Sequence, residues 1–225
     1  MLSSISRVVE LKILSGEKVK AKVLSRRTHW NAVRRIISYL KGTPQLGICY
    51  NGSTSGPALL AYSDSDHAGC LDSRKYTTGS VFLLHGGPIA WKSRRQKCVS
   101  KSTKVSEYIA VSETASDAVW IRRILPDLIP GWGQLPVQIF CDNQAAILLT
   151  AHQHQRQSTK MVDTHYHYIR EQQKKEEITL EYMKSADQLN QTSADILSAD
   201  ILTKPLHVSR FTDLRSRLGI VQVPH

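Results

Sequence analysis

Four acidic residues lie where apolar runs of the chain give way to turns or helices, and this placement is the first indication of chemistry. Asp64 and Asp142 each follow a short apolar run typical of a buried strand, and Glu107 lies in the first turns of a long helical pattern. The fourth is Asp200, with Asp195 as the alternative, in a short repeat near the end of the chain. We expect four carboxylates to converge on one site.

Carboxylates that converge in this way are suited to binding Mg²⁺, which prefers a few carboxylates together with water and phosphate oxygens. Two Mg²⁺ ions about 3.5–4 Å apart, with Mn²⁺ as a substitute, can activate a water and stabilise the leaving oxygen in phosphodiester cleavage. Each residue also has a simpler interpretation: Asp64 could cap a turn, Asp142 could be the N-cap of a following helix, and Glu107 could be a solvated helix residue.

The composition favours a polyanionic partner. The chain has 225 residues, a formal net charge of +11 and a pI near 9.6, and 41% of its residues are hydrophobic, which is enough for a real core. A basic protein with a solvated surface is the alternative. Lys92, Arg94, Arg95 and Lys97 follow the end of a predicted strand and could contact a nucleic-acid backbone.

Cysteine usage and hydropathy indicate an intracellular protein. The four cysteines are scattered and form no C-x-x-C pair, so a reducing compartment is favoured over a zinc site or a disulfide framework. No apolar run is long enough to cross a bilayer, and charged residues make the first 14 positions a poor signal peptide. We expect no membrane partner.

The periodicity predicts an α/β fold with antiparallel strands first and parallel pairing later. The strand–helix order after residue 136 is typical of parallel pairing. Predicted strands cover 58–62, 78–84, 88–91, 137–141 and 178–183; predicted helices cover 28–41, 103–125 (ended by Pro126), 145–150, 163–170 and 194–206.

Composition divides the chain into three parts. Residues 1–57 form a basic lead-in with a helical connection segment, and a loop-like stretch at 51–57 joins this part to the main domain. The main domain covers residues 58–206, and residues 207–225 form a C-terminal tail without a usable signal.

Six runs of residues resemble, in order, the ribonuclease H domain of copia-type retrotransposon Pol polyproteins. The helix around Trp30 also resembles the segment that links reverse transcriptase to ribonuclease H in those polyproteins. The six runs are AYSDSDHAG at 61–69, KYTTGSVF at 75–82, STKVSEYIA at 102–110, CDNQAA at 141–146, DTHYHYIRE at 163–171 and ADILTKPL at 199–206.

The resemblance implies a ribonuclease H-like fold, with a five-stranded mixed sheet (three antiparallel strands, then parallel ones) flanked by helices. It also implies cleavage of the RNA strand of RNA–DNA hybrids. Asp64, Glu107, Asp142 and a last Asp would be catalytic metal ligands. Such a fragment would work beside a reverse transcriptase domain, in the cytoplasm (within a virus-like particle) or in the nucleus.

Several positions depart from the family pattern. Val105 stands where the family usually has Glu, and His67 where it usually has Trp. The largest departure is a duplication, in which SADIL at 193–197 recurs at 198–202. Asp200 is favoured as the fourth ligand because the run TKPL follows it, and Asp195 remains the alternative. The alternative function is therefore a catalytically degenerate ribonuclease H-like domain that binds nucleic acid.

Overall fold

A computed structural model describes most of the predicted domain. The predicted helix at 145–150, Asp195, Lys97 and His67 lie outside the described residues. The described residues are 26–50, 59–66, 75–96, 103–133, 135–142, 144, 160–183 and 199–223.

A five-stranded mixed sheet forms the centre of the molecule. Its strand order is β4-β3-β2-β5-β6; β4, β3 and β2 pair antiparallel, and β2, β5 and β6 pair parallel. This is the predicted ribonuclease H-like arrangement, which is confirmed. The strands are β2 (Leu59–Asp66), β3 (Thr77–Leu84), β4 (Gly87–Arg95), β5 (Val137–Cys141) and β6 (Ile178–Tyr182).

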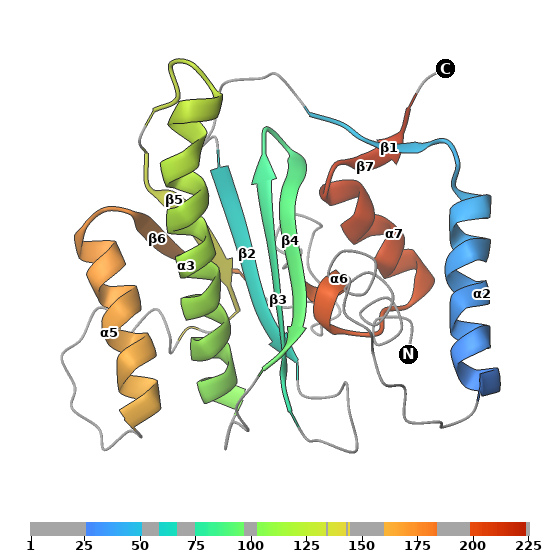
Figure 1. Cartoon of the computed structure of the whole chain (residues 1–225), viewed down its shortest axis with the longest axis horizontal. Helices are drawn as coiled ribbons and strands as arrows, with labels where there is room; N and C mark the ends of the chain where they lie inside the picture. The colour runs from blue at the N-terminus through green and yellow to red at the C-terminus, as the bar shows by residue number, and fades with distance from the viewer. Residues whose placement is uncertain are drawn as a thin grey trace.

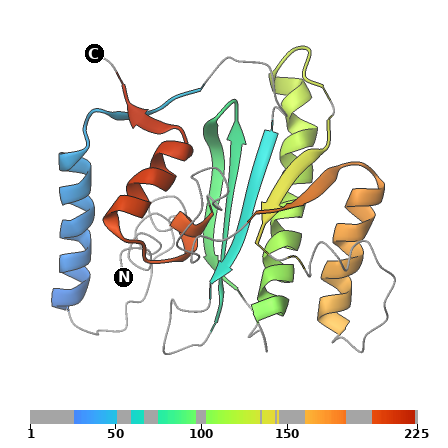
Figure 2. The ribbon, with the colours of Figure 1, turned by 180° about the vertical axis from the view of Figure 1, so that it is seen from behind.

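Helices cover both faces of this sheet, as Figures 1 and 2 show from opposite sides. One face carries α3 (Thr103–Leu128) and α5 (Lys160–Lys174), and the other carries α6 (Asp200–Thr203) and α7 (Val208–Arg217). Because β2 is central and both of its faces are covered, its residues alternate between two hydrophobic cores rather than between core and solvent. None of the described helices is long and apolar enough to span a membrane.

The helix α3 is longer than its sequence pattern predicts. The sequence predicts that Pro126 ends this helix at residue 125, and the prediction is wrong because the helix continues to Leu128. A proline near the end of a helix removes one N–H but leaves later bonds possible. The amide of Ile129 accordingly donates to the carbonyl of Leu125 at 2.9 Å.

The C-terminal tail has regular structure, although its sequence carries no usable signal. It contains α7 and β7 (Ile220–Gln222), and β7 pairs antiparallel with β1 (Leu46–Ile48). The connection helix α2 (Arg26–Gly42) lies beside α7, where the rings of Tyr39 and Phe211 meet edge to face at 5.7 Å. The two ends of the described chain therefore form one small unit, while the predicted boundaries at 57/58 and 206/207 stay predictions.

Gly79 allows α6 to lie directly against the sheet. It pairs with Asp64 across the β2–β3 ladder. A Cβ atom at this position would lie 2.5 Å from Thr203 Cγ2 and 3.2 Å from the carbonyl oxygen of Ala199. Only a residue without a side chain lets α6 approach this closely.

Replacing Gly79 with alanine should therefore displace α6 and destabilise the protein by about 1–3 kcal/mol, the usual cost of overpacking. Urea unfolding measures this change. Gly42→Ala is the matched control, because a Cβ there meets nothing within 4 Å. Equal unfolding midpoints for the two variants would contradict the packing described for α6.

Candidate metal centre

Asp64 and Asp142 meet because they lie on neighbouring parallel strands. The ladder between β2 and β5 pairs Ser63 with Cys141, so the residue that follows each of them is a carboxylate at the same edge of the sheet. Ligand sites of α/β sheets lie at the carboxyl ends of such strands. Asp64 is 1% exposed, and Asp142 is half-buried.

Glu107 reaches the same point from α3. It lies in the first turns of that helix, where both the sheet and α5 cover the helix and the side chain is buried. One carboxylate oxygen from each of Asp64, Glu107 and Asp142 lies within 4.8 Å of the other two. We call these three residues the carboxylate triad. The structure thus brings together three of the four predicted site residues.

Two buried oxygens of the carboxylate triad fit a metal ion. Asp64 Oδ1 and Glu107 Oε2 are buried and have no hydrogen-bond partner. Their sister oxygens are both bonded, Asp64 Oδ2 to the hydroxyl of Thr203 and Glu107 Oε1 to that of Ser65 at 2.8 Å. A buried carboxylate oxygen without a hydrogen bond is costly, and a divalent cation satisfies it.

Burial and mutual repulsion disfavour ionisation of Asp64 and Glu107. Burial raises the pKa of Asp64 to about 7; Lys204 opposes this rise, and the charges of Asp200 and Asp142 add to it. Burial, followed by repulsion from Asp64 and Asp142, also raises the pKa of Glu107 well above its usual range. A bound cation would favour the ionised forms of both carboxyl groups.

Ser65 favours the charged form of Glu107, because its hydroxyl donates to Oε1 and thereby lowers the glutamate pKa. We expect Ser65→Ala to raise that pKa further and to weaken Mn²⁺ binding about tenfold near pH 7. Titration with Mn²⁺ at several pH values measures this effect, and the affinity should recover at alkaline pH. The exposed Ser216→Ala serves as the control; an equal loss of affinity at every pH would argue against this role.

Asp200 lies near the triad but is bound by two basic groups. Its Oδ1 is 3.1 Å from Lys204 Nζ, and its Oδ2 is 3.3 Å from an amino nitrogen of Arg210. Lys204 Nζ also lies 3.7 Å from Asp64 Oδ1. Asp200 is thus buried beside Asp64, in a place consistent with the predicted fourth position, whereas Asp195 lies outside the described residues.

The predicted nucleic-acid-binding residues lie along β4. Lys92 Nζ is 2.5 Å from Asp117, and Arg94 lies 3.9 Å from Glu113, so both basic groups are paired with acids of α3. Arg95 is exposed at the end of the strand, and Lys97 lies outside the described residues. Among the described members of this set, Arg95 therefore has the most accessible position.

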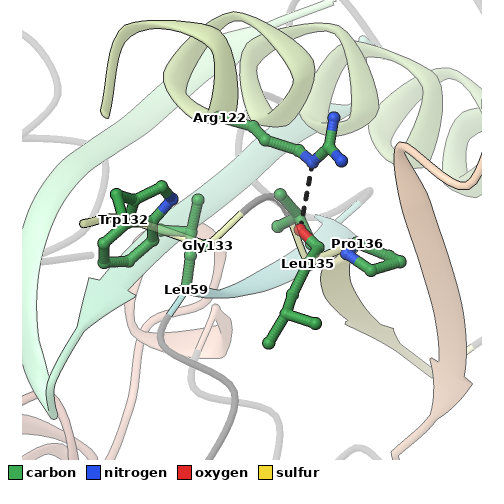
Figure 3. Close-up of a pocket in the computed structure, with 7 residues that line it drawn as sticks. Leu59, Arg122, Trp132, Gly133, Leu135 and Pro136 are labelled. Carbon is green, nitrogen blue, oxygen red and sulfur yellow. Dashed lines mark hydrogen bonds between the residues drawn. The ribbon is translucent and has the colours of Figure 1, made fainter. Parts of the chain in front are cut away.

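A pocket, drawn in Figure 3, lies away from the triad. Leu59 in its wall is the first residue of β2, about 17 Å along the strand from Asp64 at 3.3 Å per residue. Arg122 lines the pocket and donates from Nε to the carbonyl of Leu135 at 3.0 Å. The lining has no carboxylate, so this pocket has no metal ligands. Its residues are Leu59, Arg122, Trp132, Gly133, Leu135, Pro136 and Val137.

Sequence reasoning missed four residues that contact the candidate ligands: Ser65, Thr203, Lys204 and Arg210. Ser65 follows Asp64 directly in β2, so the two side chains point to opposite faces of the sheet. Lys204 follows Asp200 by four residues, which is helical spacing. Both residues could therefore have been found from strand and helix periodicity. Arg210 had no such signal, because its contact depends on how α7 packs.

Comparison with curated proteins finds retrotransposon relatives. The chain is 38% identical over 194 residues to the retrovirus-related Pol polyprotein from transposon TNT 1-94 of Nicotiana tabacum, which covers 86% of this chain and 14% of that protein. It is 36% identical over 197 residues to the retrovirus-related Pol polyprotein from transposon RE2 of Arabidopsis thaliana, and this match covers 87% of this chain and 13% of that protein. The chain thus spans about a seventh of the length of these relatives. No family model matches it.

A solved structure of low sequence identity shares the fold. A foamy viral protease-reverse transcriptase in complex with double-stranded DNA matches with a TM-score of 0.51 and 17% identity, over 83% of this chain and 29% of that one. LC11-RNase H1, isolated from compost, matches with a TM-score of 0.42 and 12% identity, over 56% of this chain and 84% of that one.

Proposed function

We propose that the ribonuclease H-type domain of this chain, whose homologues are copia-type retrotransposon Pol polyproteins, hydrolyses the RNA strand of RNA–DNA hybrids. The single observation that carries this proposal is the carboxylate triad. Three acidic residues, on β2, on α3 and just after β5, each place one carboxylate oxygen within 4.8 Å of the other two. Two buried oxygens of this group have no hydrogen-bond partner.

The triad residues Asp64, Glu107 and Asp142 would hold divalent metal, Mg²⁺ by preference with Mn²⁺ as a substitute. When bound, the metal would supply a water activated near neutral pH and neutralise charge on the leaving oxygen. The protein orients the ligands: Thr203 and Ser65 each hold one oxygen, which leaves the other oxygen directed for coordination. Fixed ligands of this kind reduce the reorganisation required during reaction.

The net charge of +11 supports a nucleic-acid substrate. Recognition of a hybrid depends on duplex shape and 2′-hydroxyls, whereas phosphate contacts supply salt-sensitive affinity. Arg95 is an exposed cation at the end of β4, and we propose it as a phosphate contact. We propose Lys92, Arg94 and Lys97 as further phosphate contacts. Lys92 and Arg94 would first break their ion pairs with Asp117 and Glu113.

Cleavage of four matched duplexes tests this function. The duplexes are RNA–DNA with label on the RNA, the same hybrid with label on the DNA, RNA–RNA and DNA–DNA, each incubated with Mg²⁺ and with EDTA. We expect cuts in the RNA of the hybrid alone, and only with Mg²⁺. A folded protein that binds the hybrid but leaves its RNA intact would overturn the proposal.

A second candidate is a catalytically degenerate domain that binds nucleic acid. The observation that favours it is the ion pairing of Asp200, the predicted fourth ligand. Its two carboxylate oxygens bind Lys204 and Arg210 instead of being open to a metal ion. This candidate predicts that the four duplexes give hybrid binding without cleavage.

A reverse transcriptase domain is the protein partner that we propose for α2. Trp30, Ile37 and Leu40 of this helix are each more than half exposed and lie on one stripe. An exposed apolar stripe of this kind commonly marks an interface. Pull-down of a separately expressed reverse transcriptase domain by wild type, but not by Trp30→Ser, would support the contact.

A further inference from the structure

A lysine lies between the triad and the fourth carboxylate. Lys204 Nζ is 3.1 Å from Asp200 Oδ1 and 3.7 Å from Asp64 Oδ1, so one ammonium group bridges two buried acids. Asp200 is absent from the group of carboxylates whose ligand atoms lie within 4.8 Å of one another. Among the described residues, a positive charge of the protein thus separates Asp200 from the proposed metal ligands.

Several contacts fix this lysine in place. Its backbone amide donates to the carbonyl of Asp200 at 3.0 Å, and the preceding Thr203 donates its hydroxyl to Asp64. The turn that carries both residues packs on Gly79 and accepts a hydrogen bond from Ser93 at the carbonyl of Leu202. The Lys204 side chain is 19% exposed, so it has little freedom to move into solvent.

The charges of this region balance with one divalent ion. Among the residues that the structure describes, four carboxylates lie here, namely the triad and Asp200, and two basic groups are paired with them, Lys204 and Arg210. With all groups ionised, two negative charges remain, which one divalent cation neutralises. A second divalent ion would have to share the space between Asp64 and Asp200 with an ammonium group, against direct repulsion.

We propose that Lys204 is a resident cation between Asp64 and Asp200, and that the protein without nucleic acid therefore binds one divalent ion, at the carboxylate triad. This inference rests on the proposed function, because it assumes that the triad binds metal. Lys204 acts as a positioning residue through these two acids. A second ion can bind only after Lys204 leaves Asp200, for instance when substrate phosphate attracts its ammonium group.

Counting bound ions tests the proposal without substrate. The full chain is titrated with Mn²⁺ near pH 8, and free Mn²⁺ is measured by electron paramagnetic resonance. We expect one bound ion in the wild type, one in Lys204→Arg and two in Lys204→Met, since the methionine removes the charge but retains most of the chain length. Lys175→Met is the matched control, because Lys175 also pairs at i,i+4 spacing (with Glu171) but lies on the exposed surface of α5 and its following turn. It should bind one ion.

The outcomes separate the two proposals. Two ions in the wild type, or one ion in a folded Lys204→Met, would overturn the role of Lys204. No bound ion in the wild type would overturn metal binding by the triad and with it the proposed function. If Lys204→Met fails to fold by circular dichroism, Lys204→Gln replaces it, and the wild-type count alone still decides between one ion and two.

Discussion

Replacing Asp142 with asparagine should lower the rate of RNA cleavage by about 1,000-fold or more, because a neutral amide replaces one charged member of the triad. Binding of the RNA–DNA hybrid should persist, since the substitution removes a negative charge and no group that could contact phosphate. Single-turnover cleavage and fluorescence anisotropy, measured on the same preparation, provide the two readouts.

Asp127→Asn provides the matched control for this substitution. Asp127 is exposed near the end of α3, about 30 Å along the helix from Glu107 at 1.5 Å per residue. The control should cleave at the wild-type rate. Unchanged turnover in Asp142→Asn would remove this residue from the site, and a parallel loss of hybrid binding would indicate a folding defect.

The metal-free protein should lose stability as pH rises toward 7. Burial raises the pKa of Asp64 from 3.8 to about 7, so the folded protein binds a proton that the unfolded chain has already released. An acid with a raised pKa in the folded state destabilises that state progressively as pH increases through this interval. At about 1.4 kcal/mol per pH unit, we expect a loss of about 2 kcal/mol between about pH 5.5 and 7.

Urea unfolding in EDTA across this interval measures the effect. Asp64→Asn should remove the contribution of Asp64 to the slope, because asparagine does not titrate, and the remaining slope reports Glu107, whose pKa is also raised. Mg²⁺ should restore stability above pH 7, where both carboxylates can ionise around it. A wild-type protein whose stability in EDTA is flat, or rises over this interval, would contradict the buried environment of Asp64.

The sequence was most informative where a strand ends in an acid. The strand predicted at 137–141 has those bounds, and its parallel pairing with β2 places Asp142 beside Asp64, as expected from the strand–helix order. Period-2 alternation and the carboxyl-end rule suffice for this result, because both depend on local pattern. Glu107 could be placed for the same reason, since it lies early in one long helical pattern.

Other features of the fold and the site depend on tertiary packing and could not be predicted from the sequence. The helix α7 is short and polar on most sides, yet its Leu214 and the following Leu218 are buried, and Leu218 packs in one core cluster with Val81 and Leu83. Lys204 follows Asp200 at helical spacing, whereas Arg210 carries no signal that distinguishes a basic residue at a buried acid from one in solvent. The choice between Asp195 and Asp200 likewise depends on which residue the chain places beside Asp64, and it stays a prediction because Asp195 lies outside the described residues.

The most direct test of the metal centre is an anomalous difference map from crystals of the wild-type protein grown with Mn²⁺. We predict a peak within coordination distance of Asp64 Oδ1 and Glu107 Oε2, the two buried oxygens without a hydrogen-bond partner, with Asp142 as the third ligand. Manganese found elsewhere on the protein, with this position occupied by water alone, would contradict the assignment of the triad as the metal site.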